Sequence, residues 1–175
     1  MLDTFRRGAE AAGAQVDVMR VADLDIEPCT NCDGCRDTGE CVISDDMEGI
    51  YKKLAVADGL ILASPIYFGS VSAYTKAVIE RFQIYWFINF GNENLKHLKT
   101  PTRRPAAFLA VGGMKNKKYC DSVRITAEAL FLNTRLNFRS FLCLQGYDEK
   151  GALEKNPEVL KEIYQEGWDF VSKNL

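Results

Sequence analysis

Four of the six cysteines of this 175-residue chain lie in one short segment with regular spacing. The segment CTNCDGCRDTGEC contains them in the pattern C-x2-C-x2-C-x5-C, as Cys29, Cys32, Cys35 and Cys41. Disulfide bonds are one possible chemistry, but the chain is expected to have no secretory leader, and a reducing cytoplasm would keep these four thiols free. Thiolates are also metal ligands, so zinc and iron–sulfur chemistry are the two others.

The spacing separates these two metal chemistries. Structural zinc sites usually divide their ligands into two pairs that lie a dozen or more residues apart. Two successive x2 spacings instead turn three thiolates toward a common volume, as in the bacterial ferredoxin segment with the same C-x2-C-x2-C core. The fourth cysteine follows after five residues, and Gly34 and Gly39 are expected to give the backbone the freedom for a tight wrap. The pattern favours one [4Fe–4S] cluster, with zinc or an empty reduced loop as alternatives.

The other two cysteines have different surroundings. Cys143 lies in the apolar segment FRSFLCLQG, which is typical of a buried strand, and Cys120 lies at the start of a predicted helix. A buried cysteine behaves as a small apolar residue, so both are expected to be structural and neither is assigned to the site.

The elements that must position the cysteine segment follow from the periodicity of apolar residues. Helices are predicted at 2–12 (ended by Gly13), at 45–56 (with Asp45 and Glu48 forming a capping box), at 70–85 (capped by Ser70), at 119–135, and from Pro157 to Ser172. Strands are predicted at 15–21, 59–65, 106–113 and 137–144. Alternating strands and helices predict βαβ units, and therefore a three-layer, doubly wound α/β fold with a parallel sheet. We expect a single domain over 1–175, with the cysteine loop at 28–44.

Two predicted loops lie where ligands bind in such sheets, beyond the carboxyl ends of the strands. One holds Ser64, Pro65, Ile66, Tyr67, Phe68, Gly69 and Ser70, and its aromatic side chains offer a flat wall. The other is Gly112-Gly113-Met114, which brings bare backbone N–H groups close to whatever lies above the sheet. The alternative is a pair of ordinary turns with both aromatic side chains packed inward.

Composition excludes several classes of function. The net charge of −2 argues against general binding to nucleic acid or to acidic membranes, because both require a basic excess. No segment reaches the ~18 consecutive apolar residues of a membrane span. His97 is the only histidine, so serine–histidine catalysis and multi-histidine metal sites are disfavoured, and no side chain is assigned as a catalytic acid or base.

Three segments together resemble the iron–sulfur flavoproteins, which belong to the flavodoxin-like NAD(P)H-dependent FMN reductase superfamily. They are DLDIEPCTNCDGCRDTGECVISDDM, ADGLILASPIYFGSVSAYTKAVIERF and AFLAVGG, and the most specific motifs are the cysteine array and S-P-x-Y-F-G-S. The resemblance implies a [4Fe–4S] cluster on the four cysteines and FMN on the strand ends. Residues 64–70 would then contact the isoalloxazine and ribityl groups, and Gly112 and Gly113 the pyrimidine edge. It also implies a homodimer or homotetramer.

The resemblance also implies a strand and a phosphate-binding loop ahead of the first helix, whereas this chain begins within that helix. In the order 2-1-3-4-5 that strand is central. Without it, strands 15–21 and 59–64 would lie roughly 10 Å apart, about twice the ~4.8 Å of a ladder. Their backbone groups would then remain unpaired, so we expect the natural chain to carry one more strand and a phosphate loop.

The leading functional hypothesis is an FMN-dependent oxidoreductase with a [4Fe–4S] cluster. It would transfer electrons between a reduced donor, ferredoxin or NAD(P)H, and an acceptor that the sequence does not specify. One alternative is an NAD(P)H-dependent FMN or quinone reductase without a cluster. The other is a flavin-free electron carrier or redox-sensing subunit.

Overall fold

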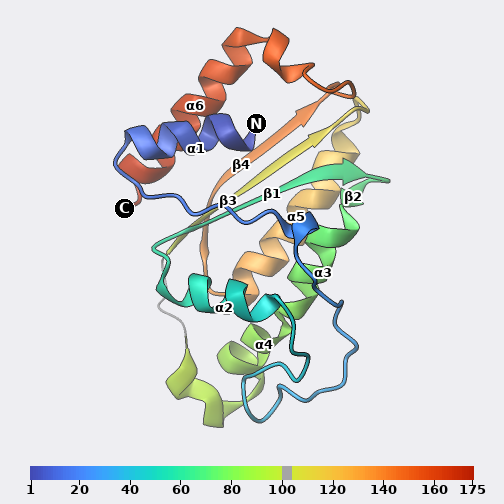
Figure 1. Ribbon diagram of the computed structural model, residues 1–175, viewed down its shortest axis with the longest axis vertical. Coiled ribbons are helices and arrows are strands. Elements are labelled where there is room, and N and C mark those ends of the chain that lie inside the picture. Colours follow the sequence, from blue (N-terminus) through green and yellow to red (C-terminus); the bar gives the residue numbers. More distant parts are fainter. Residues whose placement is uncertain (100–103) are drawn as a thin grey trace.

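A four-stranded sheet with the order β2-β1-β3-β4 lies at the centre of the computed structural model, which describes residues 1–99 and 104–175 (Figure 1). Its strands are β1 (Leu60–Tyr67), β2 (Ser70–Val71), β3 (Pro105–Gly112) and β4 (Asn137–Gln145). The strands β1, β3 and β4 are parallel, and β2 turns back antiparallel on the end of β1. The parallel arrangement of β1, β3 and β4 was predicted and is confirmed, whereas the antiparallel β2 was not predicted.

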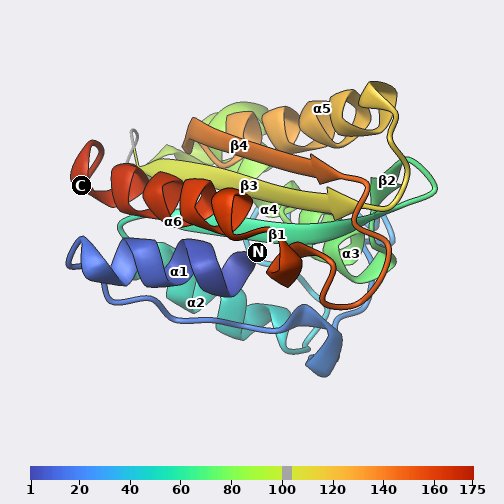
Figure 2. The same ribbon diagram turned by 90° about the horizontal axis from the view of Figure 1, so that it is seen from above.

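Helices cover both faces of the sheet, which gives the expected three layers. The helices are α1 (Leu2–Ala11), α2 (Met47–Val56), α3 (Ala73–Arg81), α4 (Gln83–Trp86), α5 (Lys117–Asn133) and α6 (Pro157–Ser172). A π-helix follows α4 at Phe87–Gly91, and 3-10 helices lie at Val21–Asp23, Glu93–Leu98 and Leu153–Lys155. Figure 2 shows α5 on one side of the sheet and α1 with α6 on the other.

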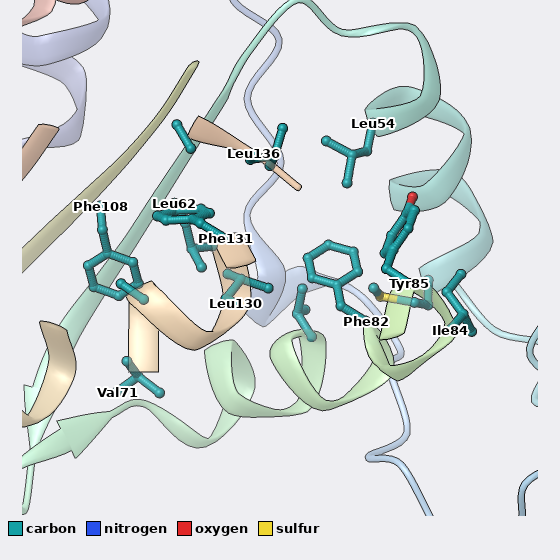
Figure 3. Packing of buried hydrophobic residues seen from close by; sticks show 14 of the residues in the cluster. Leu54, Leu62, Val71, Phe82, Ile84, Tyr85, Phe108, Leu130, Phe131 and Leu136 are labelled. Atoms are coloured by element: carbon teal, nitrogen blue, oxygen red, sulfur yellow. The ribbon is translucent and has the colours of Figure 1, made fainter. Parts of the chain in front are cut away.

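The strand β3 is buried on both faces because its side chains alternate between two cores. Phe108 belongs to a core that also contains side chains from α2, α3, α4 and α5, while Leu109 belongs to a second core that contains side chains from α1 and α6. Figure 3 shows the larger core, in which Phe131 lies beside Leu62 and Phe82 lies beside Tyr85. Phe108 and Leu109 are both completely buried, as the continuous apolar run 106–113 predicts.

The helices α1 and α6 cross at very short range because a glycine stands at each contact. A Cβ atom built on Gly8 would lie 2.0 Å from the carbonyl oxygen of Tyr164, and one built on Gly167 would lie 2.0 Å from that of Phe5. Both obstacles are backbone atoms, so a larger residue must separate the helices.

We therefore expect Gly167→Ala to lower the free energy of unfolding by about 2–3 kcal/mol, the cost of overpacking a closely packed contact. Urea denaturation followed by circular dichroism measures this change. The matched control is Gly49→Ala in α2, where no atom of the described residues lies within 4 Å of the added Cβ and stability should not fall. Equal stability of Gly167→Ala and wild type would contradict the expectation.

Two predicted elements are wrong. Residues 15–20 form no strand, because a strand requires a hydrogen-bonded neighbour and no described segment pairs with them. At the edge of β1 that faces away from β3, the only pairing in the described residues is with β2, at Ile66 and Tyr67. The predicted helix 70–85 is divided: Ser70 lies in β2, and Ser72 caps α3 by accepting a hydrogen bond from Thr75 N. Local periodicity did not reveal that Ser70 and Val71 pair back onto β1.

Cys120 at the start of α5 and Cys143 in β4 form a disulfide, with 5.9 Å between their Cα atoms. The sequence predicted both as independent structural residues, and their pairing across 23 positions was missed.

No helix in the described ranges combines the length and the apolar character that crossing a bilayer requires.

Reduction of this disulfide should lower the free energy of unfolding by about 3 kcal/mol, because the bond closes a loop of moderate length in the unfolded chain. Denaturation midpoints with and without a thiol reductant measure the effect. In Cys120→Ser the same loss should be present without reductant, and adding reductant should then change nothing. Identical midpoints for all samples would contradict the expectation.

Candidate cofactor sites

The four clustered cysteines line one pocket. Its walls are Cys29, Thr30, Asn31, Cys32, Asp33, Cys35, Cys41, Val42, Ile43, Gln83 and Phe87. All four thiols are free; Cys32 is exposed and the other three are half-buried. The last two wall residues come from α4 and the π-helix, so the loop is closed from one side by the aromatic-rich segment. Figure 1 shows this loop beside α4, below the tip of the β1–β2 hairpin.

The backbone of the loop wraps through left-handed conformations at three positions. Asn31, Asp33 and Gly39 have φ values of 54°, 58° and 73°. Asn and Asp are the non-glycine residues that adopt this region most readily. The predicted role of Gly39 is thus confirmed, but Gly34 has another one: a Cβ there would lie 2.5 Å from Val42 Cγ1, so it allows close packing within the loop.

A buried ion pair holds the two ends of the loop. The Arg81 guanidinium lies 2.5 Å from Asp45 Oδ2, and the two side chains are 1% and 4% exposed. Burial alone would raise the pKa of Asp45, but hydrogen bonds from Arg81 and from the N–H groups of Glu27 and Met47 outweigh it and lower the pKa. The capping box predicted for Asp45 and Glu48 is wrong: Asp46 is the N-cap of α2, and the Glu48 carboxylate accepts a hydrogen bond from Ser44 Oγ. The Asp45 carboxylate does accept a hydrogen bond from Met47 N, at the start of α2, but its main partner is 36 positions away.

The four thiols share this pocket without forming a ready metal site. Within the described ranges, no group of three or more Cys, His, Asp or Glu side chains is arranged to hold a metal ion. The thiols do interact electrostatically: burial, followed by repulsion from Cys41, Cys29 and Cys32, raises the pKa of the Cys35 thiol.

The second candidate site is the tip of the β1–β2 hairpin. Strand β1 runs on to Tyr67, two residues beyond the predicted end, so Ser64 to Tyr67 belong to a strand and not to a loop. Phe68 and Gly69 form the turn, with φ values of 50° and 75°. Tyr67 is 60% exposed and Phe68 is fully exposed, so the alternative in which both pack inward is wrong. Two aromatic side chains therefore stand in solvent at the carboxyl end of the sheet.

Ser64 shapes this hairpin from inside. The side chain is buried; its Oγ accepts a hydrogen bond from Ser72 N at 3.0 Å and donates one to the carbonyl oxygen of Pro65 at 2.9 Å. Pro65 has no N–H to contribute, and it lies where β1 pairs on one side only, with Val111. Ser70, in contrast, is exposed at the rim.

The loop after β3 adjoins the hairpin. A Cβ on Gly112 would lie 3.1 Å from Ile66 Cβ, and one on Gly69 would lie 2.9 Å from the ring of Tyr119. Gly113 in turn lies close to Asp148, whose Oδ1 would be 2.6 Å from an added Cβ. The predicted residues of both loops are thus neighbours at one edge of the sheet. Tyr119 and Asp148 were missed, because their proximity depends on how α5 and the β4–α6 connection pack.

Comparison with known proteins places the chain in a family. A sequence model of the NADPH-dependent FMN reductase family matches residues 1–125, well over half of the chain. The chain belongs to this family. The description of the family, NADPH-dependent FMN reductase, denotes an oxidoreductase.

Two archaeal relatives are both described as iron–sulfur flavoproteins. The one from Methanosarcina thermophila is 36% identical over 108 residues, which cover 62% of this chain and 52% of the relative. The one from Methanocaldococcus jannaschii is 44% identical over 69 residues, which cover 39% of this chain and 36% of the relative. The chain thus spans about half, or less, of the length of these relatives.

Solved structures establish the fold as flavodoxin-like. A flavone reductase superposes with a TM-score of 0.74 at 16% identity, covering 98% of this chain and 56% of that chain. The Trp repressor binding protein from Bacillus subtilis superposes with a TM-score of 0.62 at 19% identity, covering 93% and 88%. At these identities the likeness concerns the fold alone, and it agrees with the fold class predicted from the sequence.

Proposed function

We propose that this protein is an FMN-dependent oxidoreductase that also carries a [4Fe–4S] cluster on Cys29, Cys32, Cys35 and Cys41. It would transfer electrons between a reduced donor, ferredoxin or NAD(P)H, and an acceptor whose identity stays open. The observation that carries the proposal is the pocket lined by all four cysteines, in a chain of the FMN reductase family whose relatives are named iron–sulfur flavoproteins.

The hairpin and the loop after β3 are the proposed FMN site. A flavin supplies hydride and single-electron exchange when it is bound, and the protein provides its position and surroundings. In this assignment Tyr67 and Phe68 offer aromatic surface to the ring system, while the turn at Gly69 and the exposed Ser70 border it. Gly112 and Gly113 bring backbone close to the pyrimidine edge without obstruction by a side chain. The buried Ser64 side chain holds the hairpin in place through its hydrogen bonds to Pro65 O and Ser72 N.

The cysteine loop is the proposed electron-transfer site. A [4Fe–4S] cluster would accept or release one electron at a time. Gln83 and Phe87 close the pocket from α4 and the π-helix, and they limit the access of water to one side of the thiols. We further propose that the protein works in the cytoplasm as a homodimer or homotetramer, with a redox protein such as ferredoxin as partner.

The absorption spectrum of anaerobically purified protein, combined with iron, sulfide and flavin analysis, tests the proposal. We expect flavin bands, a broad sulfur-to-iron charge-transfer shoulder, and about four iron atoms per chain. Flavin without iron or sulfide would instead favour a plain NAD(P)H-dependent FMN or quinone reductase. Iron and sulfide without flavin would favour an electron carrier or a redox-sensing subunit.

A further inference from the structure

Arg81, the last residue of α3, has a fully buried side chain in contact with both ends of the cysteine loop. Its Nη1 donates to the carbonyl oxygen of Glu27 at 2.9 Å, and its Nη2 donates to that of Ile43 at 3.1 Å. These two carbonyls lie just before Cys29 and just after Cys41. A single guanidinium therefore joins the two points where the chain enters and leaves the cysteine loop.

Asp45 completes this connection from the opposite side. Its Oδ2 accepts a hydrogen bond from Nη1 of Arg81 at 2.5 Å, and its Oδ1 accepts one from Nη2 at 3.2 Å, so the ion pair is bidentate. The same carboxylate accepts the N–H of Glu27 at 3.0 Å. Both backbone polar groups of Glu27 are thus bound to the ion pair. In addition, the Tyr51 hydroxyl donates a hydrogen bond to the carbonyl oxygen of Arg81 at 2.7 Å, which connects α2 to the end of α3.

Stability alone is a weak reason for burying such a pair, because replacing a buried ion pair with apolar side chains is often neutral or stabilising. Residues 28–44 contain neither an α-helix nor a strand that could hold the cysteines in place. A planar guanidinium with several fixed donors can hold two carbonyls and a carboxylate at set positions, whereas a lysine ammonium offers no such fork.

We propose that Arg81 is the positioning residue of the cysteine site: with Asp45 it clasps the ends of the loop and thereby sets the arrangement of the four thiols. This inference rests on the proposed function, because that function assigns the cluster to this loop. Arg81 acts through the backbone at Glu27 and Ile43 and is not itself a ligand.

Arg81→Gln and Arg81→Lys, purified anaerobically, test the clasp. The matched control is Arg104→Gln. Arg104 also donates to backbone carbonyls, those of Leu54 and Ala57 at the end of α2, but none of its hydrogen bonds within the described ranges reaches the cysteine loop. Three quantities are compared: iron and sulfide per chain, flavin per chain, and the rate of trypsin cleavage after Arg36, located by mass spectrometry. Arg36 lies inside the loop, and its side chain is 56% exposed.

Both Arg81 variants should lose iron and sulfide at least about five-fold and be cleaved after Arg36 at least about ten-fold faster, because local opening of the loop no longer has to break the clasp. Flavin content and a cooperative thermal transition should persist. Arg104→Gln should match the wild type in iron, sulfide and cleavage. If Arg81→Gln fails to fold, Arg81→Lys gives the decision, since it keeps the buried positive charge beside Asp45.

Three results would overturn the inference: wild-type iron content and cleavage in the Arg81 variants, full rescue of both by lysine, or an equal loss in Arg104→Gln. Wild-type protein without iron and sulfide would instead contradict the proposed function. The two failures are thus distinguishable, because cleavage after Arg36 reports on the loop in every sample.

Discussion

Cys35→Ala is expected to abolish the cluster, lowering iron from about four atoms per chain to near zero, because a cubane that loses one of four thiolate ligands leaves an iron open to solvent and oxygen. Cys35 is half-buried in the pocket that all four cysteines line. Iron and sulfide analysis and the loss of the charge-transfer shoulder measure the effect. Flavin should remain bound, because the proposed flavin site uses none of the cysteines.

The control for this prediction is Cys120→Ser, which also removes a cysteine but lies in the disulfide with Cys143 and outside the loop. This variant should keep its full complement of iron and sulfide, although its stability falls. Unchanged iron in Cys35→Ala would contradict the assignment of the ligands. Equal loss in both variants would indicate that iron content follows overall stability.

The second large effect is expected at the hairpin turn. In Gly69→Val a β-branched residue must adopt a φ near 75°, and its Cβ must displace the ring of Tyr119, 2.9 Å away. Left-handed backbone costs an L-residue about 1–2 kcal/mol, so FMN affinity should fall about ten-fold or more when the turn moves away. Fluorescence titration of flavin-stripped protein with FMN measures this change.

Gly49→Ala serves as the control for the titration, because its added Cβ meets no atom within 4 Å in the part of the chain that the structure describes, and because it lies in α2, outside the proposed flavin site. Its FMN affinity should equal that of the wild type. An unaltered affinity in Gly69→Val would place the flavin elsewhere, whereas a loss in both variants would point to a general effect on folding.

The elements that were predicted well are those whose signals are local. Helix α1 ends where Gly13 adopts a φ of 98°, and α6 begins at Pro157, which needs no hydrogen bond for its backbone nitrogen. The apolar run of β3 is buried on both faces, as expected of a central parallel strand. In each case the residues that decide the structure are adjacent in the sequence.

The wrong predictions concern pairings between distant segments. Residues 15–21 alternate like a strand, but alternation produces a strand only where a neighbour supplies hydrogen bonds. Residues 70–71 continue the period of the following helix, yet they pair with the end of β1. Whether such a segment becomes strand or helix depends on which edge of the sheet is within reach.

The candidate sites divide in the same way. Sequence alone determined that four thiols must lie close together, because the short spacing from Cys29 to Cys41 holds them together whatever the fold. Tertiary structure decided that Arg81 and Asp45 join the ends of that loop, that Cys120 meets Cys143, and that the aromatic side chains of the hairpin face solvent. The physical reason is chain length: contacts over a few residues are limited by the covalent geometry, whereas contacts across 23 or 36 positions exist only once the helices have packed on the sheet.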